Sequence, residues 1–224
     1  LKRKAAGEPL QHLLGTTEFF RREFLTDARA LIPRPETEEL VEMVLNRIPA
    51  HPVRVLDMGT GSGIIGITLA LELKDRAREV VLADISPKAL AVARQNMTGN
   101  HLSARVSCVQ ADALGEPPAF LGKFDMIVSN PPYITTAEMA ELPHSVKDFE
   151  PALALHGGDD GLDFYRAVAE NFTRLIASGG YLCFEFGLGQ HVAVSMILQE
   201  YGYTDIALRK DLRGVIRAAR GTKK

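Results

Sequence analysis

The sequence predicts an α/β protein built on a mostly parallel sheet with helices on both faces. Apolar segments of strand length alternate along the chain with segments that have helical spacing, which is the pattern of such sheets. One strand-like segment runs directly into a glycine-rich loop and then an apolar helix. The chain has 224 residues, 46% of them hydrophobic, and this length indicates one main domain with a small appendage.

Charge and hydropathy argue against two classes of partner. The 26 basic and 28 acidic side chains nearly cancel, so we expect no direct nucleic-acid partner. No apolar run approaches the roughly 20 residues that cross a bilayer, so we expect no membrane partner.

Cys108 and Cys183 each lie in an apolar strand-like segment, which suits buried, reduced thiols and a cytoplasmic location. His144 and His191 lack metal-ligand spacing, so no metal site is predicted.

The N-terminal part of the chain precedes the regular alternation. Residues 7–31 combine an aromatic cluster with mixed charge and predict a hairpin or an irregular lead-in. Residues 36–47 follow a proline and have apolar residues at helical spacing, so we expect a helix that packs on the sheet. We therefore divide the chain into a lead-in segment, residues 1–31, and a main domain, residues 32–224.

A strand at residues 53–58, a glycine-rich loop and a helix at residues 64–73 predict a pocket for a nucleotide-like ligand. The loop consists of Gly59, Thr60, Gly61, Ser62 and Gly63. Glycines let the backbone approach a ligand closely, and free amides at the helix start favour polar or anionic groups. Because Gly61, Gly63 and Gly66 also match the dinucleotide fingerprint, the loop alone fits a nicotinamide oxidoreductase. A tight turn without a ligand is the remaining interpretation.

Two acidic residues follow successive strands. Asp84 directly follows a strand predicted at residues 80–83, and Asp112 follows another predicted at residues 105–110. Open α/β sheets bind ligands at the carboxyl ends of their strands, so both acids are expected near one adenosine ligand. Asp84 is suited to accept from the ribose hydroxyls and Asp112 from the adenine amino group. Solvated acids that only cap their turns are the alternative.

The motif Asn130-Pro131-Pro132-Tyr133 follows a strand at residues 124–129. The two prolines fix φ and remove N–H donors, so the carbonyl groups around Asn130 are held in place with no competing ladder partner. The Asn130 side-chain carbonyl and a neighbouring backbone carbonyl can then accept both hydrogens of an incoming NH2 group. Tyr133 is placed to stack on a flat amide or base. No base adjoins the motif, which favours catalysis by positioning and electrostatics.

The C-terminal part is expected to complete the sheet. We predict a helix over 162–176 that ends at Gly179-Gly180, and then a buried strand over 181–186. A further helix over 191–201 precedes two strands, over 203–208 and 214–219, which are expected to close the sheet as an antiparallel pair.

Taken together, these motifs resemble those of class I S-adenosylmethionine-dependent methyltransferases that act on planar nitrogen. The matching segments are residues 55–63, Asp84 and the motif at 130–133. Residues 7–15, 32–38, 148–155 and 157–161 further resemble the PrmC/HemK family, which methylates the glutamine of the Gly-Gly-Gln loop in peptide chain release factors. The resemblance covers the whole chain. It implies a Rossmann-like sheet of seven strands with helices on both faces and a closing antiparallel strand pair.

The resemblance also implies roles for individual residues. S-adenosylmethionine would lie with its methionine part on the loop from Gly59 to Gly63, its ribose on Asp84 and its adenine beside Asp112 and Ala113. Asn130, Pro131, Pro132 and Tyr133 would hold the glutamine amide. Asp57 resembles the acid that steadies the glycine loop, although a buried strand-end acid satisfied by backbone amides explains it almost as well.

Partner recognition is expected to involve more than the catalytic pocket. The family carries a helical domain ahead of residues 32–38, and residues 1–31 resemble its tail and the hairpin that follows. The resemblance implies a release factor as protein partner, with docking that needs surface from that helical domain. We expect the enzyme to be a monomer that yields S-adenosylhomocysteine as product.

Alternatives from other classes remain open at the level of sequence. The same tetrapeptide serves enzymes that methylate adenine N6 or other planar nitrogens, and a ribosomal protein glutamine is a further acceptor. A DNA enzyme would be expected to carry a basic target-reading segment, and none is visible. A nicotinamide oxidoreductase leaves residues 130–133 unexplained. A non-catalytic module with this fold leaves the intact motifs unexplained.

Overall fold

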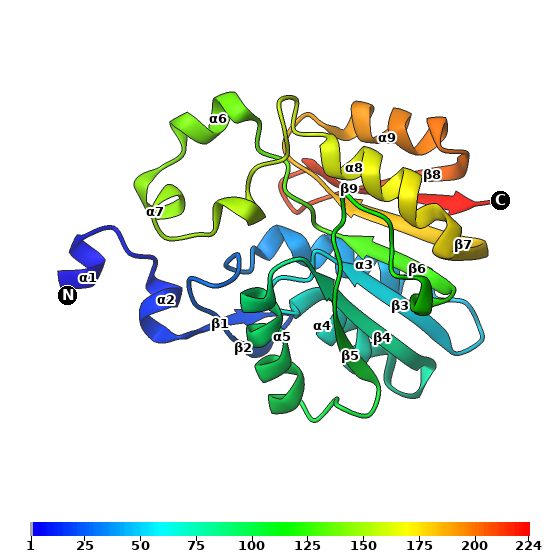
Figure 1. The fold of residues 1–224 in the computed structure, drawn as a ribbon, viewed down its shortest axis with the longest axis horizontal. Helices are drawn as coiled ribbons and strands as arrows, with labels where there is room; N and C mark the ends of the chain where they lie inside the picture. The colour runs from blue at the N-terminus through cyan, green and yellow to red at the C-terminus, as the bar shows by residue number, and fades with distance from the viewer. Residues whose placement is uncertain (1) are drawn as a thin grey trace.

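The computed structural model describes residues 2–224, and its centre is a seven-stranded sheet (Figure 1). The strand order is β5-β4-β3-β6-β7-β9-β8, with β9 antiparallel to both of its neighbours and the other pairs parallel. This order confirms the predicted α/β fold with a closing antiparallel pair. The strands are β3 (Val53–Met58), β4 (Ala77–Asp84), β5 (Val106–Gln110), β6 (Phe124–Ser129), β7 (Ile176–Glu185), β8 (Tyr203–Lys210) and β9 (Ile216–Lys223).

Helices connect the parallel strands and cover the sheet. The α-helices are α1 (Lys2–Ala5), α2 (Leu10–Leu14), α3 (Glu38–Leu45), α4 (Ile64–Leu73), α5 (Pro87–Gly99), α6 (Thr136–Glu141), α7 (His144–Lys147), α8 (Asp163–Ala167) and α9 (His191–Glu200). Short turns of other helix types are η1 (Pro35–Thr37), η2 (Lys74–Arg76), η3 (Ala119–Leu121), η4 (Ala152–Ala154), η5 (Val168–Phe172) and η6 (Thr173–Leu175). In Figure 1, α6 and α7 extend away from the sheet, on the same side as the N-terminus. Among residues 2–224, no helix is both long and apolar enough to cross a bilayer.

Two apolar cores form because side chains alternate between the faces of each strand. In β3, Val53 and Val55 join the core under α3, α4 and α5, whereas Leu56 and Met58 join the core under α8 and α9. The strands are therefore buried on both faces, and this explains their nearly continuous apolar sequences.

The N-terminal segment contains the predicted hairpin. Strands β1 (Thr16–Phe19) and β2 (Arg22–Leu25) pair antiparallel, and Phe19 and Phe24 are buried in the core under α4. The Asn96 side chain links this hairpin to the glycine loop. Its Oδ1 accepts from Leu25 N at 2.7 Å, and its Nδ2 donates to Leu25 O and Ser62 O at 3.1 and 2.9 Å. The division of the chain at residue 31 stays a prediction, and residue 1 lies outside the described residues.

The prediction was wrong where the chain enters β7. The expected helix over 162–176 is instead a succession of α8, η5 and η6, and β7 begins at Ile176. Gly179 and Gly180 lie inside the strand and do not end a helix. At Gly180 a Cβ would lie 2.7 Å from Asp125 O, so a glycine lets the two backbones approach where the register with β6 shifts. The last strand, β9, also differs, because it begins at Ile216 and continues to Lys223.

Candidate active site

The glycine loop after β3 is shaped by three residues in the left-handed region. Gly59, Gly61 and Gly63 have φ of 73°, 56° and 88°, which side chains with a Cβ rarely adopt. The amides of Gly59 and Thr60 both donate to Ala83 O, at 2.8 and 2.9 Å. The loop is therefore fastened to the end of β4 and lies beside Asp84.

The buried Asp57 carboxyl holds the loop from behind. Its Oδ2 accepts from Thr60 Oγ1 at 2.6 Å and from Gly66 N at 2.8 Å. Burial raises its pKa to about 6, although these two hydrogen bonds oppose the shift. At Gly66 a Cβ would lie 2.3 Å from the Leu82 side chain, so close packing of α4 on the sheet accounts for this glycine. The third glycine of the dinucleotide fingerprint has this same packing role, so Gly66 does not distinguish between the two kinds of ligand.

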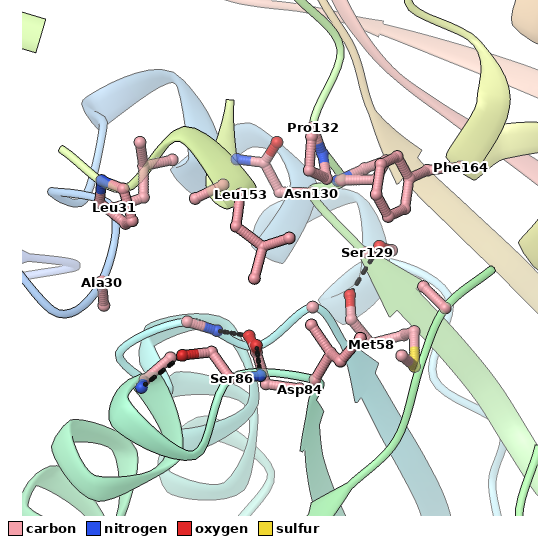
Figure 2. Close-up of a pocket in the computed structure, with 18 of the residues that line it drawn as sticks. Ala30, Leu31, Met58, Asp84, Ser86, Ser129, Asn130, Pro132, Leu153 and Phe164 are labelled. Carbon is pink, nitrogen blue, oxygen red and sulfur yellow. Dashed lines mark hydrogen bonds between the residues drawn. The ribbon is translucent and has the colours of Figure 1, made fainter. Parts of the chain in front are cut away.

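Asp84 binds both the glycine loop and the start of α5. Its Oδ2 accepts from Gly61 N and its Oδ1 from Ser86 N, each at 2.9 Å (Figure 2). Ser86 in turn caps α5, because its hydroxyl accepts from Ala89 N at 3.2 Å. Burial raises the pKa of Asp84, and the amide hydrogen bonds oppose this effect. The carboxylate is thus fixed at the cavity wall, in a geometry that can accept from vicinal hydroxyls.

A cavity of about 180 Å³ lies over the carboxyl ends of β3, β4 and β6. It brings together most of the residues predicted to bind cofactor or substrate: Gly59, Gly61, Asp84, Asp112, Ala113, Asn130, Pro131 and Pro132. Thr60 and Ser62 are buried and line a smaller cavity beside the loop, which Asn130 also lines. Gly63 packs on α5 and lines neither cavity. Its role is therefore in the shape of the loop.

Sequence reasoning missed the apolar walls of this cavity. Ile85, Leu114 and Leu153 are 41%, 48% and 56% exposed, and all three line it. Ile85 and Leu114 each lie directly beyond a residue that was singled out, Asp84 and Ala113, so their position in the chain was an available signal. Other apolar side chains at the cavity are those of Leu31, Met58 and Phe164 (Figure 2). A slot with apolar walls and acids at its edge suits a flat purine with an attached ribose.

Asn130 and Pro131 stand between this cavity and a second one. The second cavity, of about 160 Å³, is lined by Asn130, Pro131 and Tyr133 and by apolar residues of the segment that carries α6 and α7. Asn130 Nδ2 donates to Thr37 Oγ1 at 3.2 Å, which leaves Oδ1 available to accept. The structure therefore places the motif where two molecules bound in adjoining cavities would meet.

Three glycines let the rest of the chain close tightly around the motif. A Cβ at Gly157 would lie 2.6 Å from Pro132 O, and one at Gly187 would lie 2.9 Å from the Tyr133 ring. Gln190 adds hydrogen bonds at the same place, because its Nε2 donates to Tyr133 O and Gly161 O, both at 3.2 Å. The motif is thus held by backbone and side-chain contacts from two separate segments, residues 157–161 and 187–190.

Gly161 offers a test of this support. Its φ is 73°, and a Cβ would lie 2.3 Å from Tyr133 O, whereas Gly189 has φ of 84° with open space around it. Both alanine variants carry the backbone strain, of about 1 kcal/mol, but only Gly161→Ala adds a collision. We expect Gly161→Ala to be less stable than Gly189→Ala by about 1 to 3 kcal/mol in urea denaturation. Equal stability of the two variants would show that Tyr133 moves aside at little cost.

Comparison with known proteins gives the family. The model of the Methyltransferase small domain matches residues 36–146. The chain is 41% identical over 217 residues to a release factor glutamine methyltransferase of Clostridium acetobutylicum, with 95% of this chain and 75% of that protein covered. It is 45% identical over 203 residues to the enzyme of the same name from Moorella thermoacetica, covering 90% of this chain and 70% of that one.

The chain belongs to the release factor glutamine methyltransferase family. Solved structures agree at the level of the fold. The hMettl16 catalytic domain, in complex with MAT2A 3'UTR hairpin 6, superposes with a TM-score of 0.71 at 15% identity, covering 99% of this chain and 92% of that one. The expected class I methyltransferase architecture is thereby confirmed.

Two segments that carry the family resemblance meet in the structure. Glu150 is buried, and its Oε1 accepts from Arg34 Nη2 at 2.6 Å while its Oε2 accepts from Ile32 N at 3.0 Å. These bonds join residues 32–34 to the loop after α7. Arg34 lines the second cavity, so the ion pair fixes one of its walls.

A third buried acid, Glu185, lies behind Asn130 and was missed by sequence reasoning. It ends β7, and burial raises its pKa to about 7, while contacts with the Thr37 and Asn130 side chains oppose the shift. Because Glu185 lies within an apolar strand sequence, the sequence alone did not indicate that it lies at the site.

Among the described residues, no cluster of His, Cys, Asp and Glu side chains could hold a metal ion.

Proposed function

We propose that this protein transfers a methyl group from S-adenosylmethionine to the side-chain amide N5 of the glutamine in the Gly-Gly-Gln motif of peptide chain release factors. The observation that carries the proposal is the pair of adjoining cavities that share Asn130 and Pro131. One has the apolar walls and edge carboxylates that suit adenosine, and the other lies on the far side of an amide-binding motif. Membership of the release factor glutamine methyltransferase family supports the choice of acceptor.

The first cavity fits S-adenosylmethionine through its own residues. Asp84 would accept from the ribose hydroxyls, and the loop from Gly59 to Gly63 would lie along the methionine part. Asp112 and Ala113 would border adenine, between the side chains of Ile85 and Leu114. Asp112 is exposed, so it is expected to contribute less binding energy than the more buried Asp84. The cofactor supplies an electrophilic methyl group on a cationic sulfur.

The motif would act by holding the acceptor nitrogen. An amide nitrogen is a poor nucleophile because its lone pair is delocalised into the carbonyl group. Asn130 Oδ1 and a neighbouring backbone carbonyl would each accept one amide hydrogen and so turn the lone pair toward the methyl donor. Tyr133 would lie against the flat amide group. Fixed acceptors of this kind lower the barrier through alignment and electrostatic preorganisation.

The test is to incubate the protein with labelled S-adenosylmethionine and a folded release factor and then to map the label by peptide mass. We expect label on the Gly-Gly-Gln glutamine of the wild-type factor and none on a factor with that glutamine replaced by alanine. Ribosomal protein and adenine-containing DNA serve as the competing acceptors. Label on either of these, with none on the release factor, would move the proposal to that substrate.

A smaller set of properties follows from this function. A release factor acts in translation, so we propose a cytoplasmic location, and a monomer is sufficient because both cavities are formed by one chain. A nicotinamide oxidoreductase is disfavoured, since it leaves the motif at residues 130–133 unexplained. Titration with NADH, followed by its fluorescence, is expected to show no binding.

A further inference from the structure

Glu185 and Asn130 occupy neighbouring positions in the sheet. Strands β6 and β7 are parallel, and the pair Ser129 and Phe184 is in register, so the next residues along each strand, Asn130 and Glu185, lie opposite one another. The alternation of side chains places both on the face covered by α3, because Val128 and Cys183 also belong to that core. Glu185 is only 4% exposed.

The Glu185 carboxyl group lacks the partners that a purely structural buried acid would have. Its Oε2 has no hydrogen-bond partner among the described residues. Arg217, the basic residue that influences it, forms an ion pair with Asp211 at 3.2 Å instead. An unpaired buried carboxylate destabilises the folded state. Such a group persists more readily where its orientation serves a site than where it only supports packing.

Thr37 completes a chain of polar contacts between the two side chains. Asn130 Nδ2 donates to Thr37 Oγ1 at 3.2 Å, and both of these side chains lie close enough to the Glu185 carboxyl group to lower its pKa. The NH2 end of the Asn130 amide is therefore the end that faces Thr37 and Glu185. Its Oδ1 is left for a ligand in the cavity.

We propose that Glu185 is a positioning residue that fixes the orientation of the Asn130 side-chain amide, so that Oδ1 and not Nδ2 is presented to the acceptor nitrogen. The inference rests on the proposed function for its catalytic consequence, but the orientation itself is a property of the protein alone. A carboxylate accepts hydrogen bonds and cannot donate them. Ionised Glu185 therefore selects one of the two amide orientations of Asn130.

Protonation is expected to remove this selection. A neutral Glu185 carries an O–H group that can donate to Asn130 Oδ1 and so compete with the substrate for it. Because the pKa of Glu185 is raised to about 7, the selecting form becomes dominant as the pH rises through 7. Activity is thus expected to rise across this range and to fall below it. The titratable or charged groups that face Glu185 are Glu36 of η1, Tyr133, Tyr165 of α8 and Arg217 of β9.

The kinetic test compares Glu185→Ala and Glu185→Gln with the wild type. We expect Glu185→Ala to lower kcat by about tenfold or more while the Kd of S-adenosylhomocysteine stays within about threefold, since the interaction acts on the acceptor side. Glu185→Gln cannot ionise, and its NH2 group can donate to Asn130 Oδ1 as the neutral acid can, so its kcat should stay near the low-pH value of the wild type and show no step near pH 7. A wild-type kcat for Glu185→Ala would overturn the proposal, and so would an unchanged pH step in Glu185→Gln.

A double variant separates positioning from a general loss of stability. If Glu185 acts through Asn130, adding Glu185→Ala to Asn130→Ala should lower kcat little further, because the group to be oriented is gone. Additive losses would contradict the proposal. Thermal unfolding of each variant identifies one that has simply failed to fold.

A direct measurement does not depend on turnover. The side-chain NH2 signals of Asn130, assigned by their loss in Asn130→Ala, can be followed by 15N NMR between pH 5 and about 9, a range that spans the expected titration. We expect them to shift with a midpoint near the pKa of Glu185 and to lose this shift in Glu185→Gln. In Glu36→Gln the midpoint should fall, because the Glu36 carboxylate raises the pKa of Glu185.

Asn130 signals that do not respond to pH, or that respond equally in Glu185→Gln, would overturn the inference even if release factor is not the substrate. Conversely, a wild-type protein that shows the shift but labels no release factor would contradict only the proposed function.

Discussion

Asn130→Ala is expected to lower kcat by about a hundredfold or more while the affinity for S-adenosylmethionine stays within about threefold of wild type. The variant removes one of the two carbonyl groups that would hold the amide hydrogens of the substrate. Alignment by fixed acceptors supplies several kcal/mol in such reactions, and the gain exists mainly in the transition state. Single-turnover kinetics with labelled cofactor would measure kcat, and calorimetry would measure cofactor binding.

A matched control variant sharpens this experiment, whereas the isosteric aspartate variant does not. Asn100→Ala is a matched control, since Asn100 follows α5 and, within residues 2–224, its side chain bonds only to Asn96 O, at 2.8 Å. Asn130→Asp keeps the shape but adds a negative charge that attracts the cationic cofactor, so its result is ambiguous. A near-normal kcat for Asn130→Ala, with an intact fold, would show that Asn130 does not orient the nitrogen, and the mechanism would have to be abandoned.

Asp84→Ala is expected to weaken S-adenosylhomocysteine binding by about 1 to 3 kcal/mol, or roughly 5- to 150-fold in Kd. The carboxylate would accept from the ribose hydroxyls, and it also receives the amides of Gly61 and Ser86. Its loss therefore removes a ligand contact and loosens the loop on which the ligand lies. Calorimetry on the folded variant measures the change.

The exposed acid of the same cavity provides the comparison. Asp112→Ala should weaken binding less than Asp84→Ala, because an exposed carboxylate remains hydrated and its interactions are screened. Unchanged affinity in Asp84→Ala would reject its assignment to the ribose. A larger effect at Asp112 would reverse the expected order of the two acids.

The strands nearest the site were predicted most accurately. Residues 53–58 and 124–129 were expected as strands and are β3 and β6 with the same bounds. Both are mostly apolar runs followed directly by residues that disfavour a strand, a glycine in one and Asn-Pro in the other, so the apolar pattern and the turn residues mark the same boundary. The positions of Asp84 and Asn130 at one edge of the sheet then followed from the parallel topology.

Other features depend on contacts that no local pattern contains. Gly179 and Gly180 have the composition of a helix stop, yet the strand passes through them because β6 approaches closely there. Leu153 and Phe164 reach the cavity only because distant segments fold over it. Glu185 is an acid inside an apolar strand, and its meaning depends on the register between β6 and β7, which the sequence does not encode locally.

The narrow partition formed by Asn130 and Pro131 has a consequence for inhibition. The two cavities share these residues together with Leu31 and Ala154, so a ligand in one lies directly against a ligand in the other. A single compound that joins adenosine to a glutamine-like amide through a short linker would occupy both at once. Its second half binds at the high effective concentration that the linker sets, so its affinity can exceed that of either fragment by about 100-fold or more. Enzymes that keep cofactor and acceptor in separated sites offer no such opportunity.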